Sequence, residues 1–198
     1  MVPFHDQVSP KPEIHFVDGV KDSSVVVIDA PSSECRGPDM ETIGRASSYA
    51  FVLDVKSAVW GGLMSFGARA RGAKGVIISG RCRDVLEHRE AGLPIFARGT
   101  STLGQRPFTR PSEIEVPLTI GCHLTSVASA ESEEWPPVVI NPGDWIVADL
   151  DGVVVIPRHQ MEAVRELCRK GREIDERCKQ DIIAGLGVAE SFKKHRGK

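Results

Sequence analysis

The sequence predicts an α/β fold in which helices and strands form layers, and three features lead to this prediction. Short runs of β-branched and aliphatic residues recur along the chain, bounded by Gly, Pro, Asn or Asp, as buried strands are. Amphipathic helical patterns separate the early runs, whereas the late runs follow one another across tight turns. Helical crossovers combined with hairpins are typical of a layered α/β domain.

The strands of the first half are the short apolar runs, expected at residues 25–28, 76–78, 93–97 and 116–120. Residues 32–48 and 98–111 lack periodicity and are rich in Gly, Ser, Pro or Thr, so we expect loops there. We expect one domain over residues 1–198, with loop insertions near 33–56 and 122–138.

Two helices are expected between these strands. From Ser57 the pattern becomes helical, with an apolar stripe at the spacing of one helix face: Leu63, Phe66, Gly67 and Ala70. Gly72 and Gly75 are expected to end this helix. A second, short helix is expected over residues 84–91.

In the second half of the sequence, the pattern predicts hairpins followed by helices. Residues 138–140 and 145–148 flank an Asn-Pro-Gly-Asp turn and are expected to pair as a hairpin. A further turn leads into a strand at residues 153–156. After Pro157 a long helix is expected to about Ile183, followed by a short terminal helix that carries Phe192. The apolar face of the long helix comprises Met161, Val164, Leu167 and Cys168.

Composition excludes several classes of protein. The 198 residues are 41% hydrophobic and 26% charged with a net charge of −2, which gives no reason to expect a nucleic-acid partner. The apolar runs are too short to cross a bilayer, and the N-terminus does not resemble a secretory signal. Five cysteines without a C-x-x-C pair indicate a reducing compartment. We therefore expect a cytoplasmic protein without a membrane partner.

Gly61 and Gly62 precede the first expected helix. Backbone N–H groups at such a position are unpaired and unobstructed, and together with the helix dipole they favour a carboxylate or phosphate. The alternative is a tight turn between a strand and a helix. G-x-G-x-x-G is absent, so a dinucleotide fold is not supported.

Arg83, Asp84 and Glu87 follow a strand and open a helix, where α/β sheets commonly bind ligands. Arg83 can donate two hydrogen bonds to a carboxylate or keto oxygen. Asp84 offers oxygen ligands suited to Mg²⁺ or Mn²⁺, and Glu87, on the same helix face, could orient a metal-bound water. The alternative is that Asp84 is an acidic residue that stabilises the helix N-terminus, while Arg83 pairs with Glu87 on the surface.

Other polar residues give weaker signals. The six histidines have no metal-ligand spacing, so surface or structural roles are expected for them. Ser65 and Ser79 lack the Gly-x-Ser-x-Gly frame of a hydrolase nucleophile. Arg83 could lower the pKa of Cys82, but a buried residue at a strand end is the preferred interpretation.

The pattern G-x20-R-D-x2-E, formed by Gly62, Arg83, Asp84 and Glu87, resembles the signature of class II pyruvate aldolases related to 4-hydroxy-4-methyl-2-oxoglutarate aldolase. These belong to the RraA-like superfamily, named for the regulator of ribonuclease activity A. Residues 72–104 and 141–158 are also similar to this superfamily, and the segment AESFKKHRGK is similar to its fungal-type members.

The resemblance implies a β/β/α sandwich of the swivelling type with C-terminal helices, assembled as a homotrimer or hexamer with active sites between subunits. It implies that Arg83 binds the 2-oxo oxygen, that Asp84 ligates Mg²⁺ or Mn²⁺, and that Glu87 acts through water. The pyruvyl carboxylate would bind the amides of Gly61, Gly62, Leu63 and Met64.

The resemblance also implies a catalytic acid from the C-terminal helix of a neighbouring subunit. Glu176 falls nearest that position, and Asp175 and Asp181 compete with it.

The implied function is a metal-dependent lyase that cleaves 4-hydroxy-4-methyl-2-oxoglutarate-type keto acids to pyruvate, decarboxylates oxaloacetate, or does both through a pyruvate enolate. The alternative is a non-catalytic regulator that binds a ribonuclease or another protein. A methyltransferase would need a glycine-rich cofactor loop, which the sequence lacks. The extended connection near residues 33–56 is expected to alter the substrate range or impair the enzyme.

Overall fold

A computed structural model of the chain describes residues 2–3, 10–30, 56–106, 108–120 and 136–197. The chain divides into two compact units, Met1–Pro142 and Gly143–Lys198. The loop predicted at 32–48 and most of the insertions predicted near 33–56 and 122–138 lie outside the described residues. The single-domain organisation therefore stays a prediction.

A parallel sheet forms the centre of the first unit. Its central strand β4 (Gly75–Cys82) pairs with β2 (Val25–Asp29), β3 (Ala58–Trp60) and β5 (Ile95–Thr100), all in the parallel direction. Nearly all of β4 is buried, as is typical of central strands in parallel sheets, which are usually covered on both faces. This arrangement places the carboxyl ends of β3 and β4 side by side.

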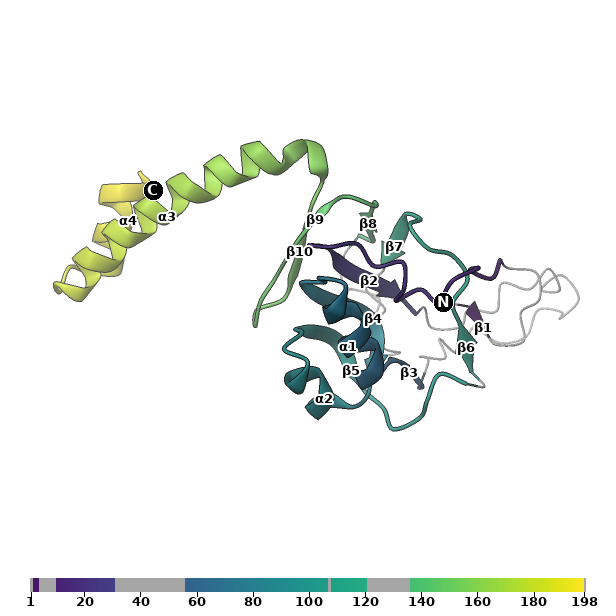
Figure 1. The fold of residues 1–198 in the computed structure, drawn as a ribbon. Helices are drawn as coiled ribbons and strands as arrows, with labels where there is room; N and C mark the ends of the chain where they lie inside the picture. Colours follow the sequence, from purple (N-terminus) through teal and green to yellow (C-terminus); the bar gives the residue numbers. More distant parts are fainter. Residues whose placement is uncertain (1, 4–9, 31–55, 107, 121–135, 198) are drawn as a thin grey trace, which may run out of the picture. The chain divides into compact units, whose positions relative to one another are not determined.

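Helices α1 (Gly62–Ala70) and α2 (Val85–Glu90) lie next to each other (Figure 1). The predicted apolar stripe of α1 is wrong, because Leu63 is 84% exposed and Phe66 is 42% exposed. The buried face consists instead of small residues, which allow close packing: Gly62, Ser65 and Ala68.

Several predicted boundaries shift. The helix expected from Ser57 starts only at Gly62, because the residues before it form strand β3 (Ala58–Trp60). The predicted loop at 98–111 is partly extended, since β5 continues to Thr100 and β6 (Thr109–Arg110) pairs with β1 (Val2–Pro3). Gly72 adopts φ +86°, a conformation that favours glycine, just after α1 as predicted.

The hairpin predicted for residues 138–140 and 145–148 is wrong. Strand β8 (Val138–Ile140) pairs antiparallel with β7 (Leu118–Ile120), whereas β9 (Trp145–Ala148) pairs with β10 (Val153–Ile156). The Pro142-Gly143 turn instead marks the boundary between the two units, so the strands on either side of it find partners within their own units.

The second unit ends in the predicted helices. The 3-10 turn η2 (Arg158–Gln160) leads into α3 (Met161–Ile183), and α4 (Val188–Arg196) folds back beside the end of α3 (Figure 1). The α/β class with C-terminal helices is thus confirmed. Within the described residues, no helix combines the length and the hydrophobicity needed to cross a membrane.

Candidate active site

The ends of β3 and β4 bring the predicted glycines together with the predicted charged residues. Strand β3 is followed directly by Gly61-Gly62, and β4 is followed directly by Arg83-Asp84. The Arg83 N–H donates to the Trp60 carbonyl at 3.0 Å, which joins the two strand ends. Adjacent parallel strands present their following loops at one edge of the sheet, where α/β folds bind ligands.

Asp84 links the two helices that begin at this edge. Its Oδ2 accepts a hydrogen bond from the Gly62 N–H at 3.0 Å, and its carbonyl accepts from the His88 N–H at 3.2 Å. Its backbone is left-handed, with φ 63° and ψ 45°, a conformation that aspartate tolerates better than most residues. The carboxylate also lies at the positive end of the α1 dipole.

The glycine turn is in direct contact with all three charged side chains. A Cβ at Gly61 would lie 2.8 Å from Asp84 Oδ2 and 3.1 Å from Arg83 Nε. A Cβ at Gly62 would lie 1.7 Å from Glu87 Oε2 and 2.6 Å from Glu87 Cβ. The turn is therefore more than a change of chain direction, because its lack of side chains is what admits the guanidinium and both carboxylates.

Arg83 and Asp84 remain accessible to a ligand, with 44% and 40% of their side chains exposed. Arg83 Nε lies 3.5 Å from Asp84 Oδ2, and its Nη1 lies close to Gly104. The alternative of a surface pair between Arg83 and Glu87 is not observed, since within the described part of the chain Arg83 pairs with Asp84.

Two amides at the start of α1 remain available. The Gly62 N–H is taken by Asp84, and the Ser65 N–H donates to the Gly61 carbonyl at 3.3 Å. The N–H groups of Leu63 and Met64 have no acceptor among the described residues. Unpaired first-turn amides are the donors that helix N-termini offer to carboxylates.

The donor set at the turn fits a hard cation that keeps most of its waters. No group of three His, Cys, Asp or Glu side chains suited to a metal occurs among the described residues. Asp84 and Glu87 nevertheless both contact the glycine turn. Mg²⁺ is commonly held by one or two carboxylates, water and substrate, so these two residues could hold it without a closed protein cage.

Three buried residues with polar side-chain groups lie beneath the turn, and no sequence motif identifies them. Trp60 Nε1 donates to Ser65 Oγ at 2.8 Å, and Ser65 Oγ lies 2.9 Å from His88 Nδ1. Burial lowers the pKa of His88, with the Asp84 charge opposing this effect. The one available hint is spacing, because Ser65 and His88 each lie one helical turn after Gly61 and Asp84.

Glu176 belongs to the second unit, so its catalytic role stays a prediction. Among the three candidate acids it has the weakest partners, Lys179 at 3.6 Å and Gln180 at 3.4 Å. Asp175 is paired with Arg196 at 2.6 Å. Asp181 accepts from two side chains of α4, and these hydrogen bonds, the one from Lys194 foremost, lower its pKa.

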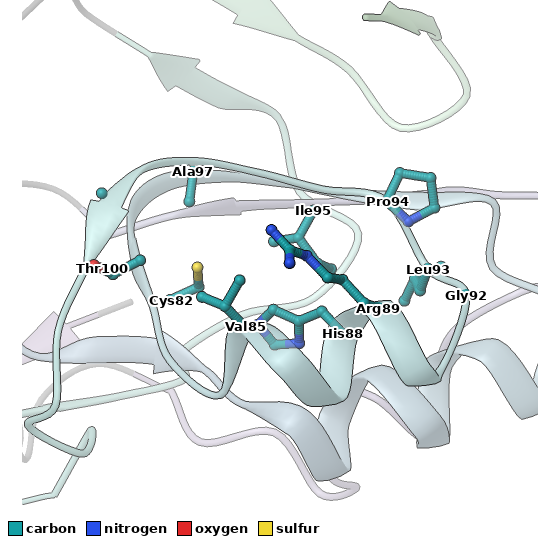
Figure 2. Close-up of a pocket in the computed structure, with 11 residues that line it drawn as sticks. Cys82, Val85, His88, Arg89, Gly92, Leu93, Pro94, Ile95, Ala97 and Thr100 are labelled. Atoms are coloured by element: carbon teal, nitrogen blue, oxygen red, sulfur yellow. The ribbon is translucent and has the colours of Figure 1, made fainter. Parts of the chain in front are cut away.

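A separate hollow of about 620 Å³ lies between α2 and β5. Figure 2 shows Arg89 extending over it, with Cys82 and His88 among the lining residues. Burial raises the pKa of the Cys82 thiol, which makes it a poor nucleophile. None of the residues predicted to bind substrate or metal lines this hollow.

A comparison with known families identifies the family of this chain. A family model described as RraA-like, Aldolase/RraA, matches residues 13–155. The chain therefore belongs to the RraA-like family.

Named relatives extend the comparison. An uncharacterized protein of Methanocaldococcus jannaschii is 28% identical over 78% of this chain and 69% of its own length. A Halalkalibacterium halodurans protein is 33% identical over 63% of this chain, and the match spans only 54% of that relative. It is named "Putative 4-hydroxy-4-methyl-2-oxoglutarate aldolase".

Solved structures share the fold. An uncharacterized protein from Pseudomonas syringae is 25% identical with a TM-score of 0.65, covering 91% of this chain and 72% of that one. Streptomyces coelicolor RraAS2, described as an unusual member of the RNase ES inhibitor RraA family, is 22% identical with a TM-score of 0.57. That match covers 84% of this chain and 69% of RraAS2.

Proposed function

We propose that this chain is a divalent-metal-dependent carbon–carbon lyase acting on pyruvate-derived 2-oxo acids. Its substrates would be 4-hydroxy-4-methyl-2-oxoglutarate-type acids, oxaloacetate, or both, because cleavage and decarboxylation pass through the same pyruvate enolate. One observation carries the proposal: Arg83, Asp84 and Glu87 meet at a glycine turn beside two unpaired amides. The aldolase name of the Halalkalibacterium relative supports it.

Each group at the turn has a separate task in this proposal. The amides of Leu63 and Met64 bind the substrate carboxylate, since the Gly62 amide already donates to Asp84. Arg83 donates to the 2-oxo oxygen and stabilises its charge as the enolate forms, an effect of several kcal/mol in preorganised sites. Mg²⁺ or Mn²⁺, held by Asp84 and through water by Glu87, would act there as a Lewis acid. Glu176 of a neighbouring subunit would supply the acid.

The test is oxaloacetate decarboxylation measured with Mg²⁺ or Mn²⁺ and again with EDTA. We expect turnover that EDTA abolishes. Arg83→Ala and Asp84→Ala should each lower kcat/KM by about 100-fold or more. Arg89→Ala is the matched control, because Arg89 is an exposed arginine of α2 that does not contact the glycine turn. If neither oxaloacetate nor 4-hydroxy-2-oxo acids react with metal present, the lyase assignment is wrong.

A regulatory role is the second candidate. Leu63 and Leu86 expose 84% and 67% of their surface on adjacent helices, and an exposed apolar patch can serve a protein partner. Capture of a ribonuclease that persists in Asp84→Ala and fails in Leu86→Ser would favour this role.

We propose a homotrimer or hexamer for the lyase, which the mass of the assembly in solution tests.

A further inference from the structure

A buried hydrogen-bonded chain beneath the glycine turn has no role in the chemistry above. Trp60, Ser65 and His88 come from three different elements, β3, α1 and α2, and at most 5% of each is exposed. Two of these elements begin at the site residues themselves. Buried polar groups are retained where geometry must be specified more closely than apolar packing specifies it.

The direction of the Trp60–Ser65 hydrogen bond follows from its donor. The Trp60 indole N–H can only donate, so Ser65 Oγ accepts. Ser65 Oγ lies 2.9 Å from His88 Nδ1, and this bond forms with either tautomer of His88, since the hydroxyl can donate to an unprotonated Nδ1 or accept from a protonated one. Among the described residues His88 Nε2 is buried without a hydrogen-bond partner. The backbone of Arg83 also interacts with the ring, and the bond to Ser65 is the side-chain link from His88 to α1.

Both partners of the Ser65–His88 bond connect through the backbone to a site residue. The Ser65 N–H donates to the Gly61 carbonyl at 3.3 Å, and the His88 N–H donates to the Asp84 carbonyl at 3.2 Å. Helices α1 and α2 are thus tied twice, by the accessible Gly62–Asp84 bond and by the buried Ser65–His88 bond. The accessible tie uses a carboxylate oxygen that a ligand of Asp84 would compete for.

We propose that Ser65 and His88 are positioning residues that hold the glycine turn in register with Asp84 and Glu87. This proposal rests on the lyase function. The buried bond keeps α1 and α2 at a fixed separation while the Asp84 carboxylate exchanges partners. Trp60 holds the Ser65 hydroxyl oxygen in place beside His88 Nδ1.

The kinetic test compares variants that remove or restore the hydrogen bond between Ser65 and His88. Ser65→Ala and His88→Leu should lower kcat for oxaloacetate about 10- to 100-fold, the usual cost of losing a supporting partner. His88→Asn should recover most of the lost rate, because its amide can place an acceptor or a donor at the position of Nδ1. Ser57→Ala is the control, since Ser57 is an equally buried serine whose Oγ has no partner within the described residues.

A second measurement does not depend on activity. In the metal-free protein, the Gly62 amide should lose protection against hydrogen exchange in Ser65→Ala and His88→Leu but not in Ser57→Ala. Unchanged Gly62 exchange and unchanged kcat in Ser65→Ala would overturn the proposal, including the case in which only the melting temperature falls. If the wild type does not turn over oxaloacetate while Gly62 exchange still responds to Ser65→Ala, the link between the helices stands and the lyase function fails.

Discussion

The two units of the chain differ in the interactions that stabilise each of them internally. The first buries a continuous apolar cluster around β4, including Val59, Trp60 and Val76, which are at most 1% exposed. In the second, the buried hydrophobic residues among those described are Ile156 and Cys178. Its long helix leaves Leu167 67% exposed and carries several ion pairs on its surface.

The two units also differ in where the chain tolerates an added methyl group. Around the glycine turn the backbone approaches charged side chains so closely that one methyl group would collide with them. On α3 the same methyl group would meet open space. Glycine therefore serves close approach in the first unit, whereas in the second it costs helix stability.

Gly62→Ala should have the largest effect. The new Cβ would lie 1.7 Å from Glu87 Oε2 and 2.6 Å from Glu87 Cβ, so rotating the carboxylate away does not remove the clash and α1 and α2 must separate. We expect a loss of about 1–3 kcal/mol in unfolding free energy and of more than about 100-fold in kcat/KM. Urea unfolding and oxaloacetate turnover measure the two. A fully active variant would contradict the close contact at this turn.

Gly61→Ala should separate activity from stability. Its Cβ would approach the ends of two side chains, Asp84 Oδ2 at 2.8 Å and Arg83 Nε at 3.1 Å, which can swing aside without moving a helix. We expect near-normal unfolding but a fall in kcat/KM of about 10- to 100-fold, because both groups leave their positions. A variant that is destabilised as strongly as Gly62→Ala would show that Gly61 has a mainly structural role.

The contrast also explains what the sequence could predict. Gly61, Gly62, Arg83, Asp84 and Glu87 meet because they follow adjacent parallel strands. The Gly-Gly pair and the G-x20-R-D-x2-E pattern singled these residues out, whereas β3 itself was not expected, since the helical pattern began at Ser57. The Ser65–His88 bond was not foreseeable, since it depends on how α1 packs against α2. The predicted apolar stripe of α1 was wrong for the same reason. Periodicity identified Leu63 and Phe66, but the face of α1 that is buried is the one with small residues.

The sequence also did not identify the strand that pairs with β8. The Asn-Pro-Gly-Asp turn is chemically suited to a hairpin, yet β8 pairs with β7 from earlier in the chain. Local turn chemistry describes a change of direction but does not identify the partner strand. The roles of Glu176 and of the metal depend on an assembly and ligands, and they stay predictions.

Gly171→Ala should strengthen the second unit. Gly171 lies inside α3, and a Cβ there meets nothing within 4 Å. Replacing an interior helical glycine by alanine adds about 0.5–1 kcal/mol of stability, which a rise in melting temperature would reveal. A fall instead would mean that another surface packs against this face of α3, and the mass of the assembly should then decrease in the variant.

The smallest effect is expected at the contact between α4 and α3. Hydrogen bonds from Lys194 and His195 hold the pKa of Asp181 below its usual range, so their stabilisation is present above the unfolded pKa of an aspartate and is lost as the pH falls through the lower folded value. Lys194→Gln should therefore lower the melting temperature slightly at neutral pH. Lys193→Gln, which removes a neighbouring lysine with no ion pair among the described residues, should not. Equal melting temperatures for the two variants at neutral pH, measured by circular dichroism, would show that the Lys194–Asp181 bond contributes nothing to this contact.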